Sequence, residues 1–187
     1  MYLHSYFVLL AFITSGLVLL IKAIALRRDG FELLGKPTID KFYFYSGKIA
    51  IFTSWALFIV KAILPKIGYI HVPLYLSWIA TILLWIGTII VSLAFIDLGR
   101  SLKVGLPQQE TMLKTNGIYR FSRNPLYAGV HLIAIGSCIY FPDLINVSCT
   151  IYGIYIHHKI IGGEELFLSR RFGKDWDNYQ SRVRRYI

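Results

Sequence analysis

Cysteine is nearly absent from this sequence of 187 residues. Its two cysteines, Cys138 and Cys149, both fall inside segments predicted to be helical, and we interpret them as small buried apolar side chains. Two such residues provide neither a disulfide framework nor a set of metal ligands, so no metal is expected. Internal repeats and low-complexity tracts are also missing, and the length predicts a single domain, residues 1–187.

Long apolar runs are abundant instead. The mean hydropathy of +0.56 and the hydrophobic content of 56% exclude an ordinary soluble domain. Three runs each exceed the roughly 20 residues that a helix needs to cross a bilayer; they are 2–26, 42–64 and 74–96. The first run lacks a basic beginning and is too long for a typical signal peptide, so we predict that it is a retained span.

Two further apolar runs, 126–141 and 144–161, are shorter, and Pro142-Asp143 separates them with a tight break. They predict either a pair of short spans or a helical hairpin that enters the bilayer only in part. The expected fold is an all-α integral membrane protein with about five transmembrane helices. Residues 1–96 supply three N-terminal spans, the last two helices form a hairpin, and a cytoplasmic amphipathic helix closes the chain.

Positive charge is concentrated in alternate loops. The loop 27–41 carries four cations, 97–125 carries five and the tail after 162 carries six, whereas 65–73 carries one. The positive-inside rule then places the N-terminus outside and the C-terminus in the cytoplasm of a multi-pass protein. The formal charge of +10 is therefore interpreted as a topology signal with a pull toward anionic lipid, and the lipid bilayer rather than nucleic acid is the expected partner.

Two polar blocks interrupt this apolar chain, at 117–129 and 162–187. In the first, Asn124-Pro125 predicts a helix start, because Asn suits the N-cap and Pro suits the first helical position. A helix N-terminus beside Arg123 is suited to a carboxylate or a phosphate. In the second block, the residues from Glu164 onward predict an amphipathic helix.

Four side chains of these blocks could form a ligand site. Glu164 and Glu165 could hold an ammonium group, ribose hydroxyls or a proton, and Tyr119 and Tyr127 offer flat apolar surfaces. Each also has a simpler interpretation: the glutamates as a solvated helix end, and the tyrosines as interfacial aromatic residues. Arg123 likewise has the alternative role of a membrane-interface anchor. Their occurrence on one predicted side of the membrane favours a shared site.

Both blocks resemble one family. The first motif is Gly117-x-Tyr119-x-x-x-Arg123-Asn124-Pro125-x-Tyr127-x-Gly129. The second is Glu164-Glu165-x-x-Leu168-x-x-x-Phe172-Gly173-x-x-Trp176-x-x-Tyr179-x-x-x-Val183-x-Arg185. Together they resemble the isoprenylcysteine carboxyl methyltransferases and their phospholipid methyltransferase relatives over residues 97–187.

The resemblance implies an integral membrane enzyme that uses S-adenosylmethionine. Its lipophilic, membrane-embedded acceptor would be a prenylcysteine-like carboxylate, a phospholipid amine or a small apolar metabolite. Carried over by motif position, the cofactor-binding residues would be Thr111, Met112, Leu113, Lys114, Tyr119, Asn124, Pro125, Leu126, Tyr127 and Glu164. Arg123 and Glu165 would be catalytic, with Glu165 as a base if the acceptor is an amine. The substrate would be met by His131, one turn after Tyr127, which would line its path or else form an interhelical hydrogen bond. Lys159 would replace the Arg that holds a substrate carboxylate in the prenylcysteine enzymes.

Two positions depart from the family pattern. Asn124 stands where the family often has His. The prenylcysteine enzymes place an Arg one turn before the glutamates, where this chain has Ile160 with Lys159 adjacent. Two other functions stay open on the sequence: an NADPH-dependent membrane reductase of the sterol reductase type, and a non-catalytic membrane subunit that retains the fold.

Overall fold

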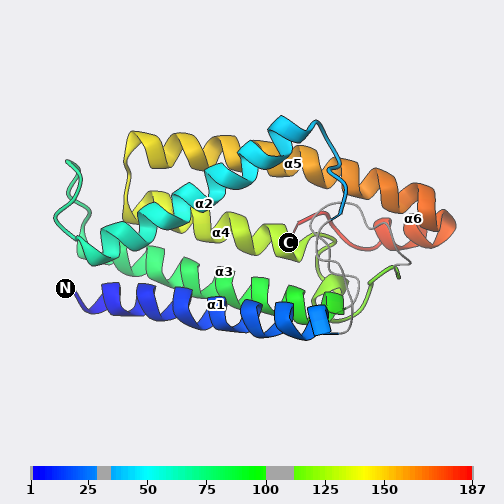
Figure 1. The fold of residues 1–187 in the computed structure, drawn as a ribbon, viewed down its shortest axis with the longest axis horizontal. Helices are drawn as coiled ribbons and strands as arrows, with labels where there is room; N and C mark the ends of the chain where they lie inside the picture. Colours follow the sequence, from blue (N-terminus) through cyan, green and yellow to red (C-terminus); the bar gives the residue numbers. More distant parts are fainter. Residues whose placement is uncertain (1, 29–34, 100–111, 187) are drawn as a thin grey trace.

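The computed structural model describes residues 2–28, 35–99 and 112–186. Helices are the regular elements of these ranges (Figure 1). In chain order they are α1 Leu3–Arg28, α2 Lys41–Ile63, α3 Leu74–Leu98, the 3-10 turn η2 Gly117–Arg120, α4 Pro125–Tyr140, α5 Leu144–Phe172 and α6 Lys174–Gln180. The prediction of an all-helical protein is confirmed over the described residues.

Three of these helices are long and apolar enough to cross a membrane. The qualifying stretches are Leu3–Leu26, Lys41–Ile63 and Leu74–Leu98, which confirms the three long spans expected from the sequence. α4 is apolar but has 16 residues, about 24 Å of helix against roughly 30 Å of hydrocarbon. The described helices therefore have the character of a multi-pass membrane protein in which α4 is a short element.

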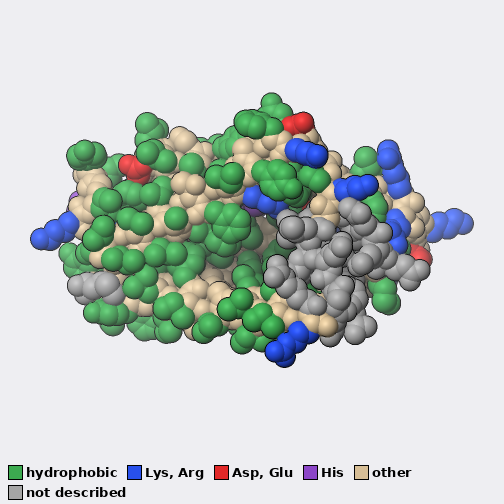
Figure 2. Space-filling view, in the orientation of Figure 1, with side chains coloured by type: hydrophobic (Ala, Val, Ile, Leu, Met, Phe, Trp, Pro, Cys, Tyr) green, Lys and Arg blue, Asp and Glu red, His purple; other side chains and the backbone are tan. Residues whose placement is uncertain are grey.

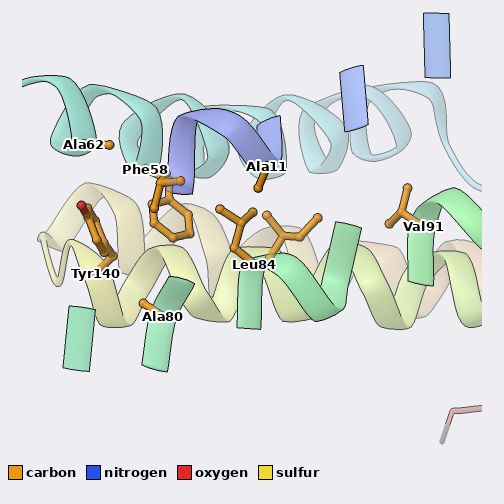
Figure 3. Close-up of a cluster of buried hydrophobic side chains, with 9 residues drawn as sticks. Ala11, Phe58, Ala62, Ala80, Leu84, Val91 and Tyr140 are labelled. Atoms are coloured by element: carbon orange, nitrogen blue, oxygen red, sulfur yellow. The ribbon is translucent and has the colours of Figure 1, made fainter. Parts of the chain in front are cut away.

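The helices pack as two pairs, α1 with α3 and α2 with α5, and α4 lies between the pairs. α3 lies along α1 and α4, α2 lies along α5, and α4 contacts both groups (Figure 1). A buried apolar cluster fills the space between α1, α2, α3 and α4 (Figure 3). It consists of Val8, Ala11, Phe58, Ala62, Ala80, Leu84, Val91, Ile133 and Tyr140.

Glycine sets the spacing between α3 and α4. A Cβ added at Gly129 would lie 2.7 Å from the carbonyl oxygen of Gly87, and one added at Gly87 would lie 2.8 Å from the carbonyl oxygen of Gly129. Small residues allow such close backbone contact between membrane helices. Because the two helices run antiparallel, this contact brings the end of α3 beside the start of α4, where the candidate site begins.

A polar turn joins α4 to α5. Asp143 caps α5 by accepting a hydrogen bond from the backbone N of Ile145 (2.9 Å). The buried Asn146 Nδ2 donates to the carbonyl oxygens of Ser137 (3.1 Å) and Phe141 (2.8 Å). The predicted hairpin and its break at Pro142-Asp143 are thus confirmed. These hydrogen bonds hold together the ends of α4 and α5 that lie away from the candidate site.

The expected separate helix from Glu164 is wrong. α5 continues without a break through Glu164 and ends at Phe172, where Gly173 has φ +49° and terminates it. Gly163 lets α5 approach the segment before α2 closely, because a Cβ there would lie 2.7 Å from the Thr38 Cβ. The amphipathic tail is therefore divided into the last turns of α5 and the short α6.

The surface separates apolar flanks from a basic end. Apolar side chains cover the sides of the helices, and Lys and Arg side chains gather at the end that carries α6 (Figure 2). The exposed apolar residues of α1, α2 and α3 contribute to this cover. Such a surface fits a bilayer around the helices and a polar phase at the α6 end.

Candidate functional site

The segment before α4 is anchored to the end of α3. The Asp97 carboxylate accepts a hydrogen bond from the backbone N of Ile118 (2.7 Å). Gly117 has φ +59°, and a Cβ at this position would clash with the Asp97 carboxylate. Only glycine accommodates both the left-handed backbone and this contact, which explains the first residue of the motif in physical terms.

Tyr119 is held in place from the C-terminal side of the chain. Its side chain is buried, and its carbonyl oxygen accepts a hydrogen bond from the Tyr179 hydroxyl of α6 (2.6 Å). Burial raises the pKa of Tyr179 to about 12, so its hydroxyl stays protonated and remains a donor. The two family motifs therefore meet here through a side chain of one and the backbone of the other.

Asn124 occupies the predicted N-cap position of α4, with Pro125 as the first helical residue. Its side chain, however, makes no capping hydrogen bond, so the expectation of Asn as a side-chain cap is wrong. The Asn124 Nδ2 instead donates to Oε1 of Glu165 (3.0 Å). The amide thus connects the start of α4 to α5.

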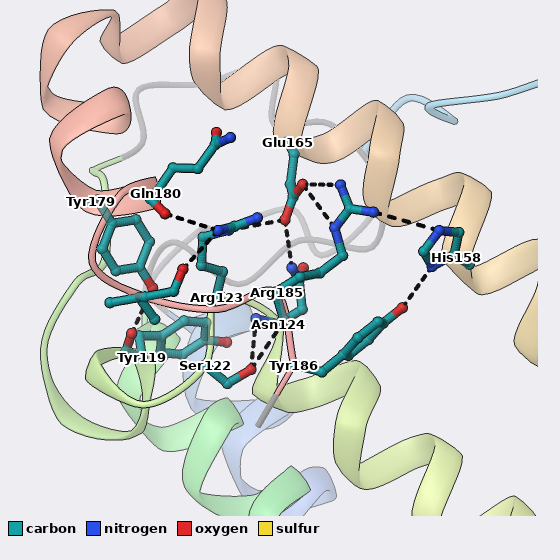
Figure 4. A network of polar contacts seen from close by, with 11 residues as sticks. Tyr119, Ser122, Arg123, Asn124, His158, Glu165, Tyr179, Gln180, Arg185 and Tyr186 are labelled. Atoms are coloured by element: carbon teal, nitrogen blue, oxygen red, sulfur yellow. Dashed lines mark hydrogen bonds and ion pairs between the residues drawn. The ribbon is translucent and has the colours of Figure 1, made fainter.

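The Glu165 carboxylate is the centre of an ionic network between α4, α5 and the C-terminal segment (Figure 4). Arg123 Nε lies 3.2 Å from Oε1, and Arg185 donates to Oε2 from Nε (3.1 Å) and Nη2 (2.6 Å). Arg123 Nη1 also donates to the carbonyl oxygens of Gln180 (3.2 Å) and Val183 (2.7 Å). Both oxygens of Glu165 are therefore occupied by partners from this chain.

These partners decide the ionisation of Glu165. Burial by itself would raise the pKa of this carboxyl, but the hydrogen bonds and charges of Arg185 and Arg123 hold it below its ordinary value. A carboxylate that is ionised and fully hydrogen-bonded is a weak proton acceptor. The geometry therefore favours a positioning role for Glu165 over the role of a base.

Glu164 is in a different environment. Its Oε1 accepts a hydrogen bond from the Tyr127 hydroxyl of α4 (2.9 Å). Burial raises the pKa of Glu164 to about 7, while the Tyr127 hydrogen bond and the Lys48 ammonium of α2 oppose this shift. No described residue donates a hydrogen bond to its Oε2. Glu164 thus lies where α2, α4 and α5 meet, with one oxygen that has no donor among the described residues.

An aromatic group continues from Tyr127 toward the interior of the bundle. The Tyr127 ring contacts the His157 ring edge-on, with centroids 5.2 Å apart. His157 in turn stacks on His131, with centroids 5.7 Å apart and planes 27° apart. Of the two residues predicted to contact the substrate, His131 lies in this aromatic group, next to Tyr127.

The remaining predicted residues lie around this centre or away from it. Met112 is exposed and Leu113 and Lys114 are half-buried, while Thr111 lies outside the described residues. Leu126 packs against the core cluster and Pro125 is buried. Lys159 is exposed, with its Nζ 5.4 Å from the centre of the Tyr155 ring, so the structure does not bring it to the glutamates.

Three further residues contribute to the site without a role predicted from the sequence. They are Lys48, His157 and Arg185. The sequence could have indicated Arg185, because it is the last residue of the second motif. Lys48 lies inside an apolar run, so only helix packing could show that it acts on Glu164. His157 lies seven residues, about two turns, before Glu164, which the sequence shows, but its contact with Tyr127 depends on helix packing.

An apolar helical bundle with a polar, ionised site at one end is the architecture of a membrane protein that could hold a polar ligand there. Comparison with known proteins gives its family. Residues 75–175 match the phospholipid methyltransferase family, which is more than half of the chain. This chain belongs to that family, whose members are S-adenosylmethionine-dependent methyltransferases. The match covers the whole of α4 and α5, and it includes both glutamates.

Two curated relatives agree with this assignment. Each is named "Probable protein-S-isoprenylcysteine O-methyltransferase", one from Oryza sativa subsp. indica and one from Oryza sativa subsp. japonica. Each is 29% identical over 114 residues, which cover 58% of this chain and 59% of the relative. The chain therefore spans less than two thirds of the length of these relatives. Together with the family match, they confirm the resemblance at the level of the family.

Proposed function

We propose that this protein transfers a methyl group from S-adenosylmethionine to a lipophilic acceptor held in the membrane. The observation that carries the proposal is the hydrogen bond between Tyr127 and Glu164. It joins the two family motifs at the point where the polar end of the bundle meets its apolar interior. Residues 97–187 would then form the cofactor-binding core and residues 1–96 its membrane support.

The residues present fit the cofactor. S-adenosylmethionine carries an ammonium group and ribose hydroxyls, which are hydrogen-bond donors, and a carboxylate, which is an acceptor. The Glu164 Oε2, with no described donor, suits the first set. The N–H groups of the first turn of α4, at Leu126 and Tyr127, lack intrahelical partners by helix geometry and suit the carboxylate. Tyr119, buried beside them, would bound the adenosine side.

The chemistry demands alignment more than acid or base strength. When bound, the cofactor supplies an electrophilic methyl group on a sulfonium, and transfer to a nucleophile is an in-line displacement. In our proposal the network of Glu165, Arg123 and Arg185 fixes α4, α5 and the tail relative to one another, so that the site keeps its shape. The apolar helices deliver the acceptor and exclude water.

The topology follows from the same proposal. The basic end of the bundle (Figure 2) would face the cytoplasm, where the cofactor is available, and the N-terminus would lie outside. The acceptor would enter from the bilayer, alongside α4 and α5. The charge pattern of the loops supports this orientation.

Isothermal titration of the purified protein in detergent tests the proposal. We expect S-adenosylmethionine to bind and NADPH not to bind. Glu164→Gln should weaken S-adenosylmethionine binding by about 1–3 kcal/mol, the range for a lost charge-assisted hydrogen bond, while the exposed Asp175→Asn should leave it unchanged. NADPH binding would instead support a reductase, and binding of neither ligand would support a non-catalytic subunit.

A methyl-transfer assay then identifies the acceptor. Purified protein is incubated with methyl-labelled S-adenosylmethionine and a total membrane lipid extract, and the labelled product is isolated. A labelled lipid from the wild type, reduced in Glu164→Gln, is the expected result. Cofactor binding without any labelled product in this extract would point to an acceptor outside the membrane lipids.

A further inference from the structure

Two histidines between α4 and α5 have buried ring nitrogens without a hydrogen-bond partner. Both ring nitrogens of His157 and the Nε2 of His131 are buried and unpaired among the described residues. The His157 side chain is 4% exposed. The stacked pair lies next to Tyr127, whose hydroxyl reaches Glu164.

Buried polar atoms without partners are unusual, because each loses its hydrogen bonds to water and gains nothing in return. A neutral imidazole has one N–H donor and one bare nitrogen acceptor. His157 therefore presents one unused donor and one unused acceptor, on a stretch of α5 where Ile156 and Ile160 belong to a buried apolar cluster. A ligand that both donates and accepts a hydrogen bond would satisfy this pair.

The histidine pair lies between two helices that have little direct contact with each other. α4 packs mainly against α3 and α5 mainly against α2, so the direct contact between α4 and α5 is small. The C-terminal Tyr186 lies over His131, with ring centroids 6.0 Å apart. A lipophile that enters between α4 and α5 would meet the histidines in the apolar part of the bundle and Glu164 at its polar end.

An ionised carboxylate fits the pair poorly, because it only accepts hydrogen bonds and would leave the bare imidazole nitrogen without a donor. Ile160 is fully buried in an apolar cluster, and Lys159 lies on the exposed side against Tyr155. Arg185 is bound to Glu165. Lys48 acts on His157 electrostatically, and Glu164 in turn acts on Lys48. Lys159 and Arg185 are therefore directed away from an acidic acceptor beside the histidines.

We infer that His157 and His131 bind the reacting group of the methyl acceptor, and that this acceptor is a lipophile whose reacting heteroatom carries a proton, an amine or a hydroxyl. This inference rests on the proposed methyl transfer. The heteroatom's lone pair forms the new bond to the methyl carbon, and the carbon–sulfur bond of the sulfonium donor breaks with its electrons retained by sulfur. The proton of the heteroatom is held in a hydrogen bond by the bare nitrogen of His157 and is released to solvent with the methylated product.

Carbon-13 NMR of the histidine Cε1 atoms tests the inference on the whole protein in nanodiscs. Three probes with the same chain length separate the headgroup chemistries: dodecylamine, dodecanol and dodecanoate. The sequence has five histidines, and His131→Gln and His157→Gln assign the two signals of interest. His71, exposed in the loop between α2 and α3, is the internal control for non-specific effects of the amphiphiles.

We expect dodecylamine or dodecanol, but not dodecanoate, to shift the His157 and His131 signals saturably while the His71 signal stays fixed. The arm that gives the shift tells an amine from a hydroxyl acceptor. In His157→Phe the His131 signal should no longer respond, while S-adenosylmethionine affinity by calorimetry changes by less than about two-fold.

Three results would overturn the inference: equal shifts with dodecanoate, no shift with either protic probe, or loss of cofactor affinity in His157→Phe as large as in Glu164→Gln. The proposed function fails separately. If the wild type binds no S-adenosylmethionine while the protic probes still shift His157, the lipophile site stands and the methyl-transfer role does not.

Discussion

Arg185 and Glu165 lie 20 positions apart and form a two-point contact, with Nε and Nη2 of the guanidinium 3.1 Å and 2.6 Å from Oε2 of the carboxylate. The same carboxylate binds Arg123 and Asn124 through Oε1. One buried side chain therefore holds the C-terminal segment, the start of α4 and the C-terminal part of α5 together. The shape of the candidate site depends on this single acid.

Glu165→Gln should destabilise the protein strongly. The substitution leaves the Arg123 guanidinium, whose side chain is 9% exposed, buried without a counter-ion, and breaking a buried pair from one side costs about 3–5 kcal/mol. Arg185→Ala should cost only about 1 kcal/mol, because the Arg185 side chain is 37% exposed and exposed pairs contribute little. Thermal unfolding in detergent measures both; equal losses would argue against the central role of Arg123 in the network.

Glu164→Gln should change the pH dependence of stability. The pKa of Glu164 rises from 4.5 to about 7 in the folded protein. Between these values the folded state binds more protons than the unfolded state, so the wild type loses stability as pH rises from 4.5 to 7. The variant lacks this loss and should become the more stable protein by pH 8, whereas the two should converge below pH 4.5. Unfolding midpoints across this range test the prediction, and a constant difference would contradict it.

Gly129→Ala should disrupt the packing of α3 against α4. The new Cβ would lie 2.7 Å from the Gly87 carbonyl oxygen, and overpacking of a tight contact costs about 1–3 kcal/mol or more. Gly162→Ala is the matched control, because no atom lies within 4 Å of its added Cβ. In the α5 interior that change should stabilise the protein by about 0.5–1 kcal/mol. Opposite shifts in unfolding temperature are expected; a stabilised Gly129→Ala would show that the helices are not in close contact.

Tyr179→Phe should loosen the segment around η2. It removes the buried hydrogen bond from the Tyr179 hydroxyl to the Tyr119 carbonyl oxygen and leaves that carbonyl without this donor, at a cost of about 1–2 kcal/mol. Tyr69→Phe, at a fully exposed tyrosine, should change the stability little. Hydrogen exchange of the backbone amides of residues 117–121 should accelerate in Tyr179→Phe alone. Unchanged exchange there would mean that Asp97 is sufficient to hold the turn.

Local rules in the sequence predicted the helices and several of their boundaries. Apolar run length gave the three long spans, Asn124-Pro125 gave the start of α4, and Pro142-Asp143 gave the hairpin break, because each depends on neighbouring residues only. The continuation of α5 past Glu164 was not predicted, since the packing of Gly163 against Thr38 involves a distant part of the chain. The side-chain role of Asn124 failed for the same reason: its amide found a partner on another helix.

The sequence by itself determined that the chain is a bundle of apolar helices with a polar motif at one end, and it was sufficient to indicate the family. Only the tertiary structure decided what the two adjacent glutamates do. Neighbouring residues on a helix point about 100° apart, so Glu164 faces Tyr127 and Lys48 while Glu165 faces Arg123 and Arg185. Their pKa values move in opposite directions, because ionisation depends on charges and burial supplied by helices that are distant in the sequence.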